Sequence, residues 1–156
     1  MADEANLTIA SVLDRCHAIH ETISGLHHRR YYPSTALSEA QLPMIVPLYQ
    51  RGAHRNDVYG PENIVRNRTF NLVLWAGNLL SGLPTQSASV AMETYTELLL
   101  AAYAQRPRLQ LTGSQDALNS IVEDCFITGD QVIPSDNFLI VQFTLLVPVI
   151  HTIERY

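Results

Sequence analysis

Four of the six histidines are close together in the sequence, and their spacing is the first that could support metal chemistry. His17 and His20 are three residues apart in a helical pattern, and His27 and His28 follow shortly after it. A zinc site needs a third protein ligand and usually a fourth. Glu21, the adjacent carboxylate, is expected to point elsewhere. A polar helix edge explains the cluster better, so we expect no metal and no cofactor.

The patterns of nucleophilic catalysis are also missing. The chain has no Gly-x-Ser-x-Gly motif, and its seven glycines are too dispersed for a phosphate-binding loop. Cys125 lies among Glu123, Asp124 and Asp130, and neighbouring carboxylates raise the pKa of a thiol. Cys16 and Cys125 are therefore expected to be buried, reduced thiols. His151 is expected on a strand surface rather than as a general base, and we predict no catalytic residue and no enzymatic activity.

The length and composition limit the number of domains and the kind of surface that the protein can have. The 156 residues are enough for one domain, 1–156, and 47 % of them are hydrophobic. Charged residues make up 16 %, against a typical ~25 %. This low value fits either surface covered by other subunits or a surface rich in Ser, Thr, Asn and Gln, and both explanations stay open.

Charge and hydropathy exclude two classes of ligand. The net charge is −5, and all ten basic residues are arginine without a clustered basic stripe, so nucleic acid is not expected as the primary ligand. No apolar run reaches the ~18 residues that span a bilayer. The first residues, Met1–Glu4, are acidic rather than basic, unlike a secretory signal. We expect a soluble protein, made in a reducing cytoplasm, that does not contact membranes.

Apolar periodicity predicts helices and strands in an α+β order. The expected elements are a helix from Leu7 to about Leu26, strands over Leu42–Tyr49 and Ile64–Ala76, a helix from Gln86 or Ser87 to Gln105, a short strand or extended link at Leu109–Leu111, and strands over Ser120–Val132 and from Phe138 to about Arg155. Asp3 or Asn6 is expected to cap the first helix, and Gly25 to end it. This order predicts an antiparallel or mixed sheet, with two helices packed on one face and a long C-terminal strand.

Two features of the expected strands, and the polar tract between two of them, predict departures from a regular sheet within one subunit. Pro43 and Pro47 place the first strand at an edge or at a bulge, because proline cannot donate a ladder hydrogen bond. The last strand is several times longer than the usual ~5–6 residues, so part of it is expected to leave the subunit's own sheet. The polar tract Arg51–Asn63 is expected to be a loop, and the stretch Gln50–Asn63 is expected to order only on assembly. Deleting Gly52–Gly60 is expected to leave the fold intact.

Two groups of side chains are candidates for contacts with other chains. The mixed face of the last strand keeps apolar residues that a monomer would expose. The polar tract and the following strand supply arginines and a tyrosine, which favour interfaces, although the two strand arginines could simply pair with nearby acids. The candidates are Arg51, Arg55, Tyr59, Arg66, Arg68, Phe138, Ile140, Leu146 and Ile150.

In the order of its elements, nearly the whole chain resembles the tail terminator (tail completion) proteins of long-tailed bacteriophages. The resemblance rests on the helix ending near Gly25, the Ala40–Val46 lead into the first strand, the Arg68–Leu74 strand, the Ser87–Ala104 helix and the Phe138–Phe143 strand. It implies a homo-hexameric ring in the virion neck that caps the tail tube and ends its polymerisation. The implied partners are the tail tube protein and a head–tail connector or stopper protein. DNA could pass through the lumen without sequence-specific recognition.

Two other interpretations stay open. The chain could be another phage neck or tail-tube subunit, because the same helix and sheet order occurs there. It could also be a small cytoplasmic α+β ligand-binding protein or enzyme with a pocket between helix and sheet. Native mass spectrometry separates these classes best, because a ring of identical subunits differs in mass from a monomer or dimer.

Overall fold

The computed structural model describes residues 7–33, 36–55, 63–133, 135 and 137–152. In chain order the elements are α1 (Ile9–Glu21), β1 (His27–His28), the 3-10 helix η2 (Glu39–Gln41), β2 (Met44–Arg55), β3 (Asn63–Leu80), β4 (Leu83–Pro84), α2 (Gln86–Ala104), the 3-10 helix η3 (Gly113–Asp116), β5 (Phe126–Ile133) and β6 (Phe138–Thr152). Neither of the described helices α1 and α2 combines the length and apolarity needed to cross a bilayer.

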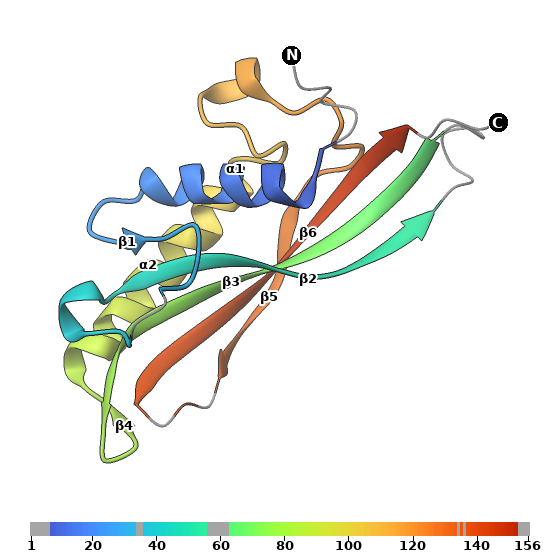
Figure 1. The fold of residues 1–156 in the computed structure, drawn as a ribbon. Coiled ribbons are helices and arrows are strands. Elements are labelled where there is room, and N and C mark those ends of the chain that lie inside the picture. The colour runs from blue at the N-terminus through green and yellow to red at the C-terminus, as the bar shows by residue number, and fades with distance from the viewer. Residues whose placement is uncertain (1–6, 34–35, 56–62, 134, 136, 153–156) are drawn as a thin grey trace.

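The strands form one long, twisted sheet with both helices on the same face (Figure 1). The strand order is β1-β2-β3-β6-β5, and β4 forms a small hairpin with the end of β3. The pairing of β1 with β2 is parallel, whereas β2, β3, β6 and β5 pair antiparallel with their neighbours. The predicted α+β class, with two helices on one sheet face and a long last strand, is confirmed.

The last strand stays inside the subunit's own sheet. β3 and β6 have 18 and 15 residues, and they pair from Asn63 opposite Thr152 to Asn78 opposite Phe138. The prediction that part of the last strand leaves the sheet is therefore wrong. β3 is long enough to satisfy the backbone of β6 over its whole length.

The first long strand extends further than its side chains suggest. After a bulge between Tyr49 and Arg51, β2 continues to pair with β3 as far as Arg55 opposite Val65. The expected loop over Arg51–Asn63 is therefore wrong for Arg51–Arg55, where backbone hydrogen bonds rather than apolar side chains hold the strand. Residues 56–62, with Tyr59, lie outside the described residues. Deleting Gly52–Gly60 would remove part of β2, so that variant is no longer expected to keep its fold.

The proline pattern of β2 predicts its position correctly. The parallel neighbour β1 covers only Met44 and Ile45, so Pro47 lies where one side of β2 has no strand partner among the described residues. The bulge follows two residues later. The predicted edge position and the predicted bulge are both confirmed.

Capping side chains fix where the two helices begin. Thr8 caps α1, since its Oγ1 accepts a hydrogen bond from the backbone N–H of Ser11 at 3.1 Å. The expected caps Asp3 and Asn6 lie outside the described residues. α1 ends at Glu21, before the expected end, and Gly25 at φ +81° lies in the turn that follows. Thr85 caps α2 in the same way, accepting from Ala88 at 3.2 Å.

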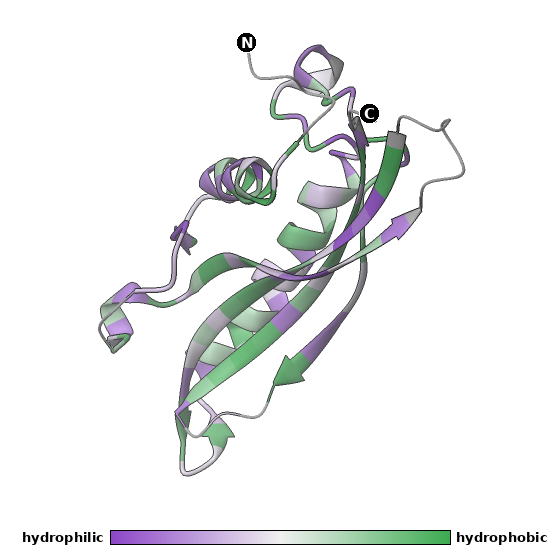
Figure 2. Ribbon diagram, turned by 45° about the vertical axis from the view of Figure 1, so that its right-hand side comes forward, coloured by the Kyte–Doolittle hydropathy of each residue, from purple (hydrophilic) through white to green (hydrophobic). Residues whose placement is uncertain are grey.

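The main core lies between the sheet and the two helices, and Figure 2 shows the apolar residues along the strands that cross it. Alternate residues of β3 and β6 face the helices, as the period of two requires. Fully buried members include Phe70, Leu72, Leu74, Phe143, Leu145, Val147, Val12, Cys16, Ile19, Leu99 and Tyr103. A second cluster on the opposite face contains Met44, Val46, Val73 and Trp75, with Leu37, Leu42, Phe138 and Ile140 packed against it.

The segment between α2 and β5 is held by side chains and by an isolated antiparallel bridge between Ile121 and Val149 of β6. Leu109 is buried with φ +54°, and of the short strand or extended link expected at Leu109–Leu111, the strand is not formed. Asp116 accepts hydrogen bonds from the backbone N–H groups of Leu111 and Thr112 at 2.6 and 3.1 Å, and Arg15 donates to the carbonyl of Leu109 at 3.1 Å. β5 consequently begins at Phe126, later than the predicted Ser120.

Candidate functional site

Two long strand edges of the sheet lack a strand partner among the described residues. β5 is the last strand on one side and pairs only with β6. On the other side, β2 has β1 beside it only at Met44 and Ile45, which leaves the edge open from Val46 to Arg55. Open edges offer backbone N–H and C=O groups to another chain. The two edges are therefore the first candidate interaction surfaces.

Both open edges carry exposed apolar side chains. On β2 the exposed fractions are 40 % for Leu48 and 37 % for Tyr49, and on β5 they are 50 % for Phe126 and 57 % for Val132. A solvent-facing edge strand is normally kept polar or charged to prevent association. Both edges depart from this rule through their exposed apolar side chains, which favours a role in association.

The β2 side of the molecule is basic. Arg51 and His54 are exposed on β2, and Arg66 on β3 places Nη1 3.1 Å from Nε2 of His54. Arg68 donates from Nη1 to the carbonyl of Leu7 at 3.4 Å. None of these contacts is with a carboxylate, so the interpretation of Arg66 and Arg68 as arginines paired with nearby acids gains no support from the described residues.

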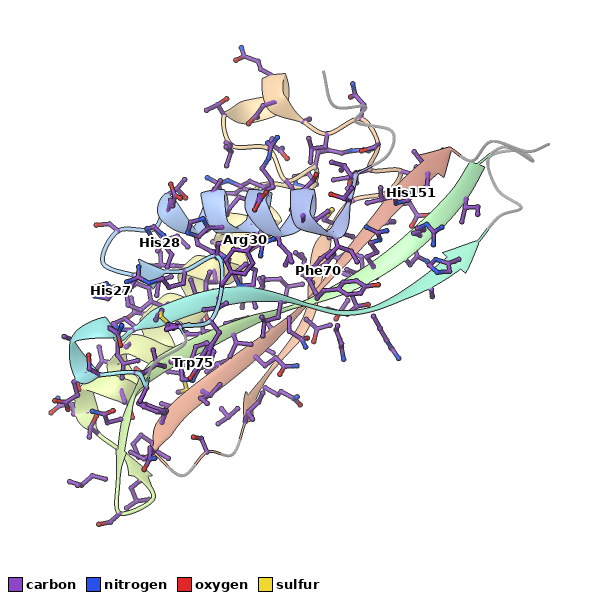
Figure 3. The ribbon with its side chains drawn as sticks, in the orientation of Figure 1. His27, His28, Arg30, Phe70, Trp75 and His151 are labelled. Carbon is purple, nitrogen blue, oxygen red and sulfur yellow. The ribbon has the colours of Figure 1, made fainter. Side chains whose placement is uncertain are left out.

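His151 belongs to the same basic group and lies at the opposite end of the sheet from Trp75 (Figure 3). Burial is the main cause that lowers the pKa of His151 to about 4, and the charges of Arg68, Arg66 and His54 act in the same direction. His151 is half-buried on β6 and neutral at neutral pH. The group is thus a positive strip formed by arginines.

The β5 side is acidic. A groove of about 360 Å³ lies between α2 and the end of the sheet, and three carboxylates are among its lining residues, Glu93 and Glu97 from α2 and Asp130 from β5. All three are exposed. The two open edges of one subunit therefore carry charges of opposite sign.

The predicted apolar contact residues of β6 are all half-buried. Phe138 and Ile140 pack on the second cluster, so the expectation that a monomer would expose them is only partly met. Leu146 lies between Thr69 of β3 and Phe126 of β5, and Ile150 is opposite Val65. Leu146 and Ile140, which is opposite Ile133, are thus the members of this group that pair with the open-edge strand β5. Arg55 lies at the end of β2.

The middle of the sheet face turned away from the helices is polar but uncharged. Gln142 is paired with Gln131 on β5, and Thr144 is paired with Asn71 on β3 and with Gly129 on β5. Amide and hydroxyl groups take the place of charged residues here. This face supports the explanation of the low charge content by a surface rich in Ser, Thr, Asn and Gln.

The histidines divide into groups that the sequence could not separate. Nε2 of His17 lies 3.0 Å from Nδ1 of His28, and Nδ1 of His17 lies 3.4 Å from Oε1 of Glu21. The prediction that Glu21 points away from the cluster is therefore wrong. His20 instead is buried, with Nε2 2.8 Å from the hydroxyl of Tyr103, and His27 is exposed.

The cysteines are buried free thiols, as predicted. Burial raises the pKa of Cys16 to about 12 and also raises the pKa of Cys125. For Cys125, burial is the largest cause, and the neighbouring Asp124 is the smallest. Neither side chain is a thiolate at neutral pH, so neither is an activated nucleophile.

A further groove on α2 is apolar and offers little for catalysis. It has a volume of about 490 Å³ and lies between the start of α2 and Pro43. Among its lining residues are Val90, Ala91 and Thr94, and Tyr95 is the one titratable side chain of that lining. The groove and the exposed Val90 and Leu98 leave the outer face of α2 available for contacts.

No protein-family model matches the chain, and no curated protein matches it. The fold and the surface together define a class of protein by geometry alone. It is an α+β domain whose sheet has one helix-covered face, an opposite face with a polar middle and an apolar cluster at one end, and two open edges of opposite charge.

Proposed function

We propose that this chain is a structural subunit that closes into a ring through its open sheet edges, and that the ring is a tail terminator of a long-tailed bacteriophage. The ring would cap the tail tube, end its polymerisation and form part of the head–tail joint. One observation carries the proposal, which is the pair of open edges with opposite charge. The resemblance additionally implies that the ring has six subunits and that its partners are the tail tube protein and a connector or stopper protein.

The direction of the edge strands suits pairing between copies. Going across the sheet, β2, β3, β6 and β5 alternate in direction, so β5 runs opposite to β2. A rotated copy placed with its β2 beside β5 would continue the sheet as an antiparallel pair. Such a contact joins two different surfaces, and it closes into a ring when the rotation per subunit divides a full turn.

Charge complementarity favours this contact over pairing of like edges. His54 and Arg66 on the β2 side would approach Glu93, Glu97 and Asp130 on the β5 side, because all of them lie on the helix-covered face of the sheet. Two β5 edges would bring carboxylates together, and like charges at an interface are unfavourable. The polar face with Gln131, Gln142 and Thr144 would then be free to line a lumen without a strong field acting on DNA.

Measuring the mass of the native protein across a dilution series tests the proposal. We expect one discrete oligomer, most simply a hexamer, and a closed ring in electron micrographs. A compact monomer at micromolar concentration that forms no ring with added tail tubes would contradict the proposal. That result would favour a small ligand-binding protein that uses the apolar groove on α2.

Reversing one edge charge is expected to weaken the ring. Arg66→Glu or Asp130→Arg places like charges across each subunit contact, and we expect roughly tenfold weaker association per contact, which is the scale of exposed ion pairs reversed in sign. Native mass spectrometry at low salt measures the effect, because salt screens such pairs. The double variant Arg66→Glu, Asp130→Arg is the matched control. It is expected to regain assembly, and equal defects in all three variants would argue against pairing of these edges.

A further inference from the structure

We infer that His17, Glu21 and His28 form a binding site for a divalent transition-metal ion, with Zn²⁺ as its simplest occupant, and that the bound ion ties α1 to β1. The ligand atoms of the three side chains lie within 4.8 Å of one another. Sequence patterns do not show this site, because His28 comes from a different element than the other two residues. The inference is independent of the proposed ring.

The elements bring the three side chains together in a simple way. His17 and Glu21 are four residues apart on α1 and so share one helix face. β1 lies beside α1, and Figure 3 shows His28 between His27 and the helix. Because successive side chains of a strand point to opposite sides, His28 is half-buried towards the helix whereas His27 is exposed.

The distances are close to those of a tetrahedral site. Nε2 of His17 and Nδ1 of His28 are 3.0 Å apart, and two nitrogens bound to one tetrahedral zinc ion at about 2.0–2.1 Å lie about 3.3–3.4 Å apart. A shift of a few tenths of an ångström at the side chains would admit the ion between them. Two imidazoles and a carboxylate are a ligand set that suits zinc, copper and nickel.

Glu21 can serve the site in two ways. Its Oε1 faces Nδ1 of His17 at 3.4 Å, and a carboxylate in that place fixes the tautomer and orientation of a metal-binding imidazole. The side chain of Glu21 is 52 % exposed, so it is also free to rotate towards Nε2 and bind the ion directly. Water would complete the coordination, because the site is open at the surface.

The charges around the site are compatible with a cation. Burial, the largest cause, lowers the pKa of His17, which keeps the ring in the neutral form that metals bind. Arg30 is the nearby positive charge, and its Nε is 2.6 Å from Oδ1 of Asp14, so that charge is balanced. His20 takes no part, since its Nε2 is bonded to Tyr103.

Titration of tag-free protein with ZnCl₂, followed by calorimetry, tests the inference. We expect one ion per chain in the wild type, and loss of at least tenfold in affinity in His17→Gln and in His28→Asn. For Glu21→Gln we expect about 10–100-fold weaker binding, the range known for carboxylates that orient a metal-binding histidine. His27→Asn is the matched control on the same strand and is expected to bind as the wild type does.

Two further measurements separate binding from misfolding. Circular dichroism without metal should show the same helix content in every variant. Addition of ZnCl₂ should raise the unfolding temperature of the wild type and of His27→Asn but not that of His28→Asn, since an ion that binds only the folded state stabilises it. A wild type that takes up no zinc, or a His28→Asn variant that binds zinc as tightly as the wild type, would overturn the inference. The 3.0 Å contact would then be a hydrogen bond between the two rings.

Discussion

Acidification from pH 7 to pH 4 is expected to destabilise the folded chain strongly, and His20 is expected to be the main cause. His20 is fully buried, with its Nε2 on the hydroxyl of Tyr103. Nδ1 is also buried and has no hydrogen-bond partner among the described residues. Burial, helped by the charges of His17 and His28, lowers the pKa of His20 to about 3. The folded state therefore holds this ring neutral where an exposed histidine would be protonated.

The sign of the effect follows from the two pKa values of His20. In the unfolded chain the ring has its ordinary pKa of 6.5, and in the folded chain the value is about 3. Between these values the unfolded state binds the proton and the folded state does not, so the free energy of unfolding falls as the pH falls. At about 1.4 kcal/mol per pH unit, the loss between pH 6.5 and pH 4 is on the order of 3 kcal/mol.

Urea unfolding of the wild type and of His20→Gln, from pH 7 to pH 4 with a chelator present, measures this contribution. Glutamine can keep a hydrogen bond to Tyr103 but has no proton to take up, so the variant is expected to show a flatter dependence on pH. Some slope will remain, because the pKa values of His17 and His151 are also lowered. The exposed His27→Gln is the control and should follow the wild type. Parallel curves for the wild type and His20→Gln would show that His20 is not the group responsible.

Filling the space at Gly77 is expected to be the most damaging small substitution in the sheet. Gly77 is buried at the bulge of β3, where the first turn of α2 crosses the strand. A Cβ atom there would lie 2.6 Å from Cβ and 2.7 Å from Cα of Ala88. Because the obstacle includes backbone of a helix, it cannot rotate away. We expect Gly77→Ala to cost about 1–3 kcal/mol, the usual range for overpacking, and Gly77→Val to cost more.

Gly129 offers a matched control for this prediction. It also lies at a β-bulge, in β5, but a Cβ atom there would meet nothing within 4 Å. Gly129→Ala is therefore expected to be neutral, or to stabilise by about 0.4–1 kcal/mol through a less flexible unfolded chain. The urea midpoints of both variants measure the difference. Equal losses at Gly77 and Gly129 would mean that the bulges, and not the contact with α2, determine the cost.

The sequence predicts best those elements whose side chains alone specify them. α2 is predicted within a residue of its observed ends, because apolar residues repeat along it and Pro107 follows it. The alternation from Phe138 onwards likewise predicts β6, and the prolines predict that β2 lies at an edge. In each case the signal is a local repeat or the loss of a backbone donor, which needs no knowledge of distant residues.

Pairing between distant strands accounts for the failures. Arg51–Arg55 read as a loop because they are polar, yet their backbone pairs with β3. Leu109 reads as a strand residue because it is apolar, yet it is buried in a turn at φ +54°. Strand membership at these positions depends on which backbone groups meet across the sheet, and side-chain pattern does not carry that information.

The sequence by itself therefore determined the α+β class, the helices, the long last strand, and the residue types available for contacts. Only the tertiary structure decided that β3 matches β6 along its whole length and that the basic β2 edge and the acidic β5 edge lie on opposite sides of one sheet. It also decided that His28 meets His17 and Glu21. These arrangements join residues far apart in the chain, and such contacts are set by the packing of the whole core rather than by local spacing.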